Sequence, residues 1–289
     1  MKKIIATYGE LCKARISVFS ALSTATGFVL AAGGAKPQLL APAFGTLLLA
    51  CGAGALNQYQ ERDIDALMER TRGRPLPSRR IPPRNALLFS LIVISLGSSF
   101  LLLTGSLPAV VLGLLAVFWY NGVYTTLKRK TAFAVVPGAL IGAIPPAIGW
   151  LAGGGSPKDP GLMVLCFFFF MWQIPHFWLF VLNRGDEYRE AGIPSLTALF
   201  SRSQLLRIVF AWVAATSVSS LFLFAGGTVR HRSIGVLLLL LSAWLFWNGT
   251  RLIQHRRDER ICSFTFRRIN IYMFVVMLSL SLDRLLGGS

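Results

Sequence analysis

Three residues that could hold a metal ion are spaced four apart in the stretch NQYQERDID: Asn57, Glu61 and Asp65. The stretch follows the apolar run LLAPAFGTLLLACGAGAL. If that run is a helix continuing past a membrane surface, one amide oxygen and two carboxylates share a helix face, while Asp63 points away. Like charges at this spacing repel unless a cation lies between them. Few, hard oxygen ligands suit Mg²⁺, which usually bridges carboxylates to substrate phosphates.

A second acidic cluster, RGDEYRE, follows another apolar run, and its Asp186 and Glu190 are again four residues apart, with Glu187 between them. One cluster alone is typical of a solvated helix end whose acids pair with neighbouring arginines. Two clusters at the same membrane face favour two half-sites that face each other. The sequence leaves open which of these three acids binds metal.

Basic residues follow the same helix ends. Arg70 and Arg74 come after the first cluster, and Lys128 and Arg129 come after a later apolar run. Arginine makes two-pronged contacts with phosphate oxygens, and lysine acts as a point charge. Each basic run alone is typical of a topology signal, but together with the acid pairs they predict a magnesium–diphosphate clamp at the membrane surface.

Long apolar helices must position these side chains. Of the 289 residues, 54% are hydrophobic and only 14% are charged. Several runs are apolar on all sides over about the 20 residues that a bilayer-crossing helix needs. The chain is therefore expected to be an all-α integral membrane protein with one transmembrane domain, 1–289. The expected spans are 16–33, 38–57, 86–104, 107–124, 134–152, 161–182, 205–226, 233–250 and 268–286.

The loop charges predict the orientation. All Lys and Arg fall on one side of the membrane except Lys36, Lys158, Arg230, Arg232 and Arg284. The positive-inside rule places the richer side in the cytoplasm, with the N-terminus and the active-site opening there. The first apolar run is expected to be retained as a span, in the cell's inner (plasma) membrane. The net charge of +17 does not indicate nucleic-acid binding, because no basic stripe with interleaved aromatics occurs.

One histidine lies within an expected span: His176, in WQIPHFW. Ionisable residues inside a membrane are candidates for function. The alternative is a neutral histidine bonded to a backbone carbonyl that Pro175 leaves free. Four scattered cysteines without a CxxC pattern make a metal or disulfide framework unexpected.

The block RDIDALMERTRGRPLPSRRI resembles the signature of the UbiA superfamily of intramembrane prenyltransferases. Within it, the chain is most similar to the protohaem IX farnesyltransferases, also called haem O synthases. CKARIS, YTTLKRKT, GAIPPAIGW, WQIPHFW and DEYREAGIP follow in the expected order, so the resemblance covers nearly the whole chain. It implies a nine-helix UbiA-type bundle that transfers a farnesyl group from farnesyl diphosphate to protohaem IX, with Mg²⁺ as cofactor.

The resemblance also implies residue roles. Asn57, Glu61 and Asp65 would hold Mg²⁺, with a second cluster drawn from the acids of DEYRE. The substrate-binding residues would be Arg70, Arg74, Lys128 and Arg129 for the diphosphate, His176 near the acceptor, and Tyr124 of YTTLKRKT. The expected surroundings and partners are the lipid bilayer and haem A synthase or oxidase assembly proteins.

The chain departs from the family pattern at several places. Glu61 stands where aspartate is usual, WQIPHFW replaces WTPPHFW, and the tyrosine–lysine spacing in YTTLKRKT is one residue shorter. These departures leave two alternatives open. One is a UbiA-type enzyme that prenylates an aromatic quinone precursor. The other is a transporter of an anionic solute, although its ionisable residues would more naturally lie near the bilayer midplane.

Overall fold

A computed structural model describes the backbone of residues 2–258 and 260–286. It describes the side chains of the same residues except residues 2–4 and Asp186. Within these ranges the chain is helical and contains no strand. The elements are α1 (Lys2–Leu11), α2 (Ala14–Ala32), η1 (Pro37–Leu39), α3 (Leu40–Asp65), α4 (Pro83–Leu102), α5 (Leu107–Phe118), η2 (Trp119–Tyr124), α6 (Thr125–Leu127), η3 (Ala132–Ala134), α7 (Val135–Gly138), α8 (Leu140–Ala152), α9 (Pro160–Leu182), α10 (Gly185–Glu190), α11 (Leu196–Leu199), α12 (Arg202–Ser219), α13 (Leu221–Ala225), α14 (Arg232–Gln254) and α15 (Ile261–Leu285).

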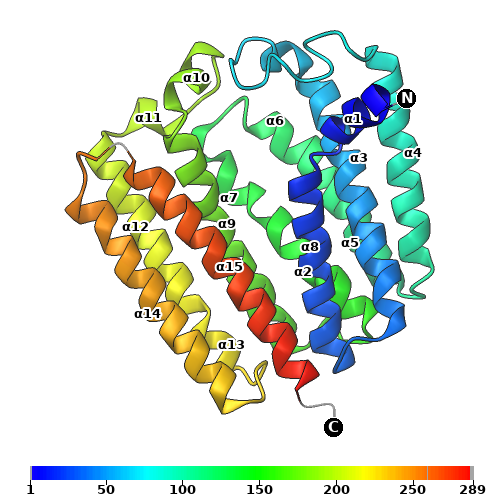
Figure 1. Cartoon of the computed structure of the whole chain (residues 1–289), viewed down its shortest axis with the longest axis vertical. Coiled ribbons are helices and arrows are strands. Elements are labelled where there is room, and N and C mark those ends of the chain that lie inside the picture. The colour runs from blue at the N-terminus through cyan, green and yellow to red at the C-terminus, as the bar shows by residue number, and fades with distance from the viewer. Residues whose placement is uncertain (1, 259, 287–289) are drawn as a thin grey trace.

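Nine helical segments in the described ranges are long and apolar enough to cross a membrane, which confirms the expected number of spans. They lie side by side, and the short helices α1, α10 and α11 gather at one end of the bundle (Figure 1). Large apolar side chains face outward, including Leu103 (74% exposed) and Trp247 (67% exposed). Such an outer surface is suited to lipid.

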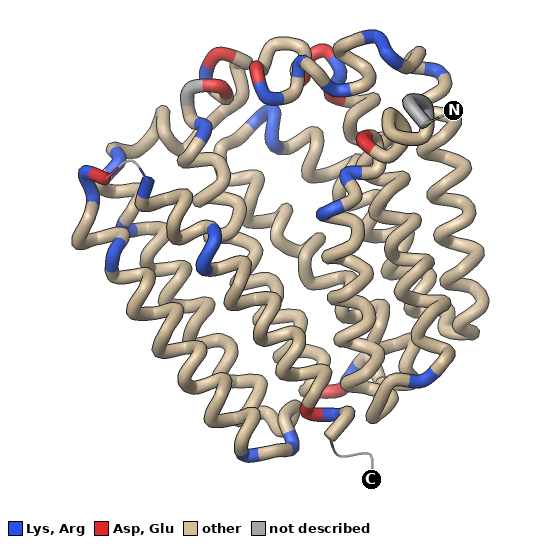
Figure 2. Tube along the Cα trace, in the orientation of Figure 1, with Lys and Arg blue, Asp and Glu red and all other residues tan. Residues whose placement is uncertain are grey.

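Charged residues concentrate at the ends of the bundle, most densely at the end where α1 and α10 lie (Figure 2). The body between the ends is almost free of acids. A charge at the bilayer centre costs several kcal/mol, so this distribution places the body in the hydrocarbon layer. It leaves the acid clusters at one membrane surface.

Helix α3 carries the first acid cluster out of that layer. Its 26 residues, Leu40–Asp65, form one unbroken helix. At 1.5 Å per residue it is about 39 Å long, whereas the hydrocarbon core is about 30 Å thick. Its last turns therefore reach the polar surface without a break, as the four-residue spacing of the cluster predicted.

Two glycines bring α2 and α8 into backbone contact. A Cβ atom at Gly149 would lie 1.8 Å from the carbonyl oxygen of Thr24, and one at Gly27 would lie 1.9 Å from that of Pro146. The Thr24 hydroxyl donates to the carbonyl of Pro145 at 2.9 Å. Small residues permit close helix crossings in membranes, and this crossing fixes α2 against α8.

Candidate active site

The three residues of the first cluster lie on one buried face of α3. Asn57, Glu61 and Asp65 are 2%, 3% and 1% exposed. The side chain of Asp63 is 87% exposed and lies 3.9 Å from the Arg62 side chain. The predicted separation of a polar inner face from an outward Asp63 is therefore confirmed.

Each residue of this face contacts a cation from another part of the chain. The Lys13 ammonium donates to Asn57 Oδ1 at 2.6 Å. The Lys128 ammonium lies 2.6 Å from Glu61 Oε1, and Arg74 Nη1 donates to Asp65 Oδ2 at 2.7 Å. Buried charges require such partners, because an unpaired one is strongly destabilising. The predicted diphosphate-binding residues Arg74 and Lys128 thus lie against the predicted acids.

Lys13 reaches the site because the chain breaks between α1 and α2. Its backbone has φ 47° and ψ 48°, the left-handed conformation, which is uncommon for a residue with a side chain. The Gln58 amide fixes the break by donating to the carbonyls of Glu10 and Leu11 at 3.0 and 3.2 Å. Burial lowers the pKa of Lys13 to about 8, and the charge of Arg74 acts in the same direction. The sequence interpretation had not assigned Lys13 a role.

A π-helical turn, η2, supplies the opposite wall. Its wider turn is often found at functional sites, and here it presents Tyr120, whose hydroxyl accepts from the Lys13 ammonium at 3.1 Å. Thr125, directly after the turn, accepts from the Asn57 amide at 3.0 Å and donates to the Tyr120 carbonyl at 2.8 Å. These contacts orient Asn57 with its oxygen toward Lys13.

Other predicted residues lie at the rim. Arg129 is exposed and donates to the backbone carbonyl of Gln60 at 2.7 Å, so it contacts α3 without touching an acid. Gln60 is held in turn by Asn121, whose amide donates to its side-chain oxygen at 3.0 Å. Tyr124 stacks on Tyr120 with ring centres 5.9 Å apart. The sequence interpretation missed Gln60, Tyr120 and Asn121.

The second cluster occupies α10 beside the first. Oε2 of Glu187 is buried without a hydrogen-bond partner in the described part of the chain, whereas Glu190 is exposed. The side chain of Asp186 lies outside the described residues. Burial raises the pKa of the Tyr188 phenol, and the nearby charges of Arg70 and Arg184 oppose that shift.

Two arginines between the two clusters make cation–π contacts with Phe180 of α9. Arg70 and Arg184 approach its ring at 5.4 and 4.9 Å. Arg70 is also within electrostatic reach of Glu187 and Arg74. The acid clusters are thus brought to one basic rim, as their common membrane face predicted.

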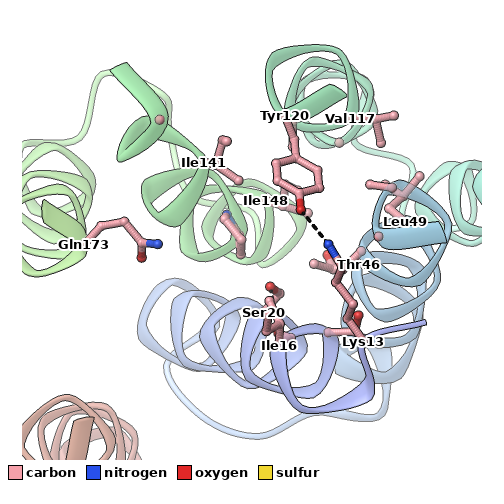
Figure 3. A pocket seen from close by; sticks show the side chains of 18 of the residues that line it. Lys13, Ile16, Ser20, Thr46, Leu49, Val117, Tyr120, Ile141, Ile148 and Gln173 are labelled. Atoms are coloured by element: carbon pink, nitrogen blue, oxygen red, sulfur yellow. Dashed lines mark hydrogen bonds between the residues drawn. The ribbon is translucent and has the colours of Figure 1, made fainter. Parts of the chain in front are cut away.

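A cavity of about 160 Å³ begins at Lys13 and Tyr120 and continues between apolar side chains, among them Leu49, Val117 and Ile148 (Figure 3). One end of this cavity therefore offers charge and hydrogen bonds, and the rest offers apolar surface. Such a shape can hold an apolar chain with an anionic head.

His176 lies in a second cavity, of about 640 Å³. Its Nδ1 is 2.8 Å from Asn270 Oδ1. The Asn270 amide nitrogen donates to the Phe266 carbonyl at 2.7 Å, which identifies Oδ1 as the acceptor. Nδ1 therefore carries the proton and Nε2 is left as an acceptor. His176 is thus bonded to a side chain, in contrast to the alternative of a backbone carbonyl freed by Pro175.

The two cavities adjoin. Both are lined by Ile16, Ser20, Ile141, Pro145 and Gln173, so these side chains form a wall shared by the cavity that begins at Lys13 and the one that His176 lines. Two molecules, one in each cavity, would meet at this wall.

The donor set suits a hard divalent cation. The Lys128 ammonium donates to Glu61 Oε2 at 2.7 Å, which leaves Oε1 buried without an aligned hydrogen bond. Oε1 itself lies 2.6 Å from the same ammonium, so both oxygens of Glu61 are in contact with Lys128, whereas Oε2 of Glu187 is buried with no hydrogen-bond partner among the described residues. Among the described side chains, no three acids, histidines or cysteines form a ready-made metal cage. Mg²⁺ needs none, because it usually takes one or two carboxylates plus phosphate and water.

Comparison with known proteins agrees with this geometry. The chain is 40% identical over 222 residues to the protoheme IX farnesyltransferase of Geobacter sulfurreducens, covering 77% of this chain and 82% of that protein. It is 34% identical over 287 residues to the protoheme IX farnesyltransferase of Nitratidesulfovibrio vulgaris, covering 97% and 96%.

Solved structures show the same fold. A digeranylgeranylglyceryl phosphate synthase has a TM-score of 0.79 at 16% identity, with 98% of this chain and 99% of that one covered. A UbiA homologue from Archaeoglobus fulgidus bound to GPP and Mg²⁺ has a TM-score of 0.67 at 13% identity, with 96% and 99% covered. The UbiA prenyltransferase family matches residues 20–277. The chain is therefore an integral membrane protein that belongs to the UbiA prenyltransferase family.

Proposed function

We propose that this protein transfers a farnesyl group from farnesyl diphosphate to protohaem IX, giving haem O. The observation that carries the proposal is the pair of adjoining cavities, one with a cationic head at Lys13 and the other containing His176. The names of the relatives at 34–40% identity support the same substrates.

The diphosphate binds at the basic rim. Lys13, Arg74 and Lys128 contact its oxygens, and Arg70 closes the opening from the side of α10. Arg129 is exposed at the rim and neutralises charge at longer range. Positioned cations stabilise the negative charge that builds up as diphosphate leaves.

Mg²⁺ is the proposed cofactor, with Asn57, Glu61 and Asp65 as the first ligand group. Of the second-cluster candidates Asp186, Glu187 and Glu190, the inward Oε2 of Glu187 makes that residue our first choice. When bound, the ion would polarise the diphosphate oxygens. Asn57, Glu61 and Asp65 would hold the ion, and the cations that contact them in this structure would then turn toward the phosphate.

The reaction needs no protein nucleophile. The allylic C–O bond breaks and diphosphate leaves with the bonding electrons. The electron pair of a haem vinyl group forms the new C–C bond to the farnesyl carbon. Water adds to the remaining vinyl carbon and loses a proton, which leaves a hydroxyethylfarnesyl substituent. The wall shared by the cavities, including Ser20 and Gln173, is where the two carbons would meet.

His176 is proposed to position the acceptor. Its Nε2 is the acceptor atom, and its ring lies between Trp172 and Phe266, with ring centres 4.6 and 4.9 Å away. Flat aromatic walls suit a flat macrocycle. Tyr124 is proposed to shape the donor side, because its ring packs on both Tyr120 and Phe177.

The same proposal includes the setting of the enzyme. The chain is a single transmembrane domain, 1–289, in the inner (plasma) membrane, with its N-terminus and the diphosphate site facing the cytoplasm. The loop charges support this orientation. Haem A synthase or oxidase assembly proteins would receive the product.

A mass-spectrometric assay tests the proposal. Purified protein in lipid nanodiscs receives farnesyl diphosphate, Mg²⁺ and reduced protohaem. We expect a haem product heavier by one farnesyl group and one hydroxyl group, whose formation is lost with a chelator and restored by Mg²⁺. Prenylation of hydroxybenzoate or naphthoate instead of haem would identify a quinone-precursor enzyme. Uptake of an anion into proteoliposomes without any prenyl transfer would identify a transporter.

A further inference from the structure

Gln173 of α9 brings an amide to the wall that the two cavities share. Of the five side chains that line both cavities, only those of Ser20 and Gln173 are polar. The Gln173 side chain extends from α9 toward the cavity that begins at Lys13 (Figure 3). It lies nine residues before Leu182, the end of α9, which is about 14 Å along the helix axis. The amide is therefore inside the hydrocarbon layer, away from the charged surface.

This amide has no hydrogen-bond partner among the described residues. The residue is half-buried, and neither its amide oxygen nor its nitrogen is one of the fully buried, unpaired polar atoms of the described chain. Both atoms are therefore open to the cavities that the residue lines. A polar group without a partner inside a membrane costs free energy. A water or a polar ligand group that bonds this amide is therefore favoured.

A glycine leaves room for the amide on the α8 side. A Cβ atom at Gly142 would lie 2.6 Å from Gln173 Oε1, closer than a Cβ atom approaches a neighbour. Gly142 also lines the large cavity. The position of the amide oxygen at the shared wall thus depends on the missing side chain at residue 142.

The other polar groups of the wall are already engaged. The Ser20 hydroxyl donates to the Ile16 carbonyl at 3.2 Å. The Pro145 carbonyl accepts from the Thr24 hydroxyl at 2.9 Å. Among the side chains of the shared wall, Gln173 can therefore both donate and accept without breaking a hydrogen bond that the described structure contains.

We propose that Gln173 positions the water that completes prenyl transfer, an inference that rests on the proposed function. In that reaction the new C–C bond leaves a cation on the second carbon of the former vinyl group. A lone pair of water then forms the C–O bond, one O–H bond breaks, and the proton passes to the diphosphate that has left. Gln173 Oε1 accepts a hydrogen bond from this water and so directs a lone pair toward the cation. The amide itself neither takes nor gives a proton.

Without an oriented water, the cation has a second route to a neutral product. The neighbouring carbon, which formed the new bond to farnesyl, can lose a proton, so that a C=C bond forms. This dehydrated haem is lighter than the hydroxylated product by one water. The ratio of the two products therefore reports how the water is held, separately from the overall rate.

Gln173→Met removes the amide with little risk to the fold, because methionine has a similar length and the lost group bonds none of the described residues. Purified wild type and variant in lipid nanodiscs receive farnesyl diphosphate, Mg²⁺ and reduced protohaem, and mass spectrometry measures both haem products. We expect the ratio of hydroxylated to dehydrated product to fall at least about fivefold in Gln173→Met, the effect of one lost hydrogen bond. Ile141→Leu is the matched apolar control on the same wall. It can change the rate but should keep the wild-type ratio.

Two further variants separate the position of the polar group from its presence. Gly142→Ala keeps the amide but displaces its oxygen, so it should also lower the ratio. Gln173→Thr carries the residue of the WTPPHFW pattern, and its hydroxyl should restore most of the hydroxylated product. An unchanged ratio in Gln173→Met, including an equal loss of both products, would overturn this proposal and leave the proposed function standing. A wild type that prenylates no haem would overturn the proposed function, and this inference with it.

Discussion

The Lys128 ammonium lies 2.6 and 2.7 Å from the two carboxylate oxygens of Glu61, although 67 residues separate them along the chain. The side chain of Glu61 is 3% exposed. Its extra methylene relative to aspartate is thus accommodated in a buried ion pair at the surface end of α3. The pair also connects α3 to the residue that directly follows α6, beside the proposed diphosphate site.

We expect Glu61→Gln to lower kcat/KM for farnesyl diphosphate by at least about 100-fold, because a proposed ligand of the Mg²⁺ that would stabilise the leaving diphosphate is lost. Steady-state assays over a Mg²⁺ series measure it. Asp63→Asn is the matched control, since Asp63 lies two residues away with an 87% exposed side chain, and it should keep activity within about twofold. Equal losses in both variants would mean that charge near the surface matters and the buried face does not.

The Asp65–Arg74 pair should show strong coupling. Asp65 has a 2% exposed side chain and Arg74 a 23% exposed one, at 2.7 Å. Removing one partner leaves the other charge without its counter-charge. Asp65→Asn and Arg74→Gln should therefore each lower the free energy of unfolding by more than half of the loss seen in the double variant. We expect a coupling of about 1–3 kcal/mol in a double-mutant cycle of thermal unfolding. Simple additivity would show that the two side chains do not interact. Asp65→Asn should also abolish turnover while the protein still folds.

His176→Ala should raise KM for protohaem by at least about tenfold, the effect of one lost hydrogen bond, and leave the affinity for farnesyl diphosphate unchanged. His176 contacts the large cavity and not the cationic head. Separate titrations of the two substrates measure the split. His255→Ala, an exposed histidine, is the control. Equal loss of both affinities would count against a role in acceptor binding.

Gly149→Ala should destabilise the bundle by about 1–3 kcal/mol, the cost of overpacking. A Cβ at this position would lie 1.8 Å from the Thr24 carbonyl oxygen, so α2 and α8 would have to separate. The melting temperature in detergent should fall accordingly. Gly34→Ala is the matched control, because a Cβ there meets nothing within 4 Å. A neutral Gly149→Ala would show that the crossing can relax.

The Glu10–Arg80 ion pair predicts a small dependence of stability on pH. Its hydrogen bond to Arg80 lowers the pKa of Glu10 below its usual 4.5. The unfolded chain therefore binds the proton first as pH falls. The pair stabilises the folded state above about pH 4.5, and this contribution is lost as pH falls through the folded-state pKa. The side chains of Arg80 and Glu10 are 39% and 47% exposed, so Glu10→Gln, which keeps the other hydrogen bonds of Arg80, should cost at most about 1 kcal/mol at pH 7. A difference that persists at pH 3 would contradict this.

Much of the architecture could be predicted from the sequence because its signals are local. Long apolar runs predicted the nine spans, and the four-residue spacing placed Asn57, Glu61 and Asp65 on one face of a continuing helix. Both signals depend only on neighbours along one element. The second span was expected to end at Asn57, but α3 continues to Asp65, which is the continuation that the spacing required.

The partners of the site could not be predicted in this way. Lys13 reaches the site because its own backbone is left-handed between two helices. Tyr120 faces the site because it lies in a π-helical turn. Neither conformation has a distinctive signature in CKARIS or WYNGVY. Which cation meets which acid depends on how distant helices pack, as with Lys128 and Glu61. Likewise, Glu187 and Glu190 are both acids of one short helix, and only packing determines that Glu187 has a buried carboxylate oxygen while Glu190 is exposed.

The tight crossing at Gly149 and Thr24 has a consequence for how a rigid macrocycle is admitted. Because α2 and α8 are in backbone contact, we expect the two helices to move together. On the other side of the large cavity, the Trp172 indole of α9 donates to the Ile269 carbonyl of α15 at 3.0 Å. The cavity is thus enclosed by two helix pairs, α2 with α8 and α9 with α15.

The seam between the pairs is much weaker. Between α2 and α15, the Ser23 hydroxyl meets the sulfur of Met277 at 3.9 Å, and Ser281 reaches Thr26 at 3.4 Å. We therefore expect the two helix pairs to separate between α2 and α15, which would open the large cavity to the lipid. A wide, flat acceptor would then arrive sideways from the bilayer, and water would stay outside.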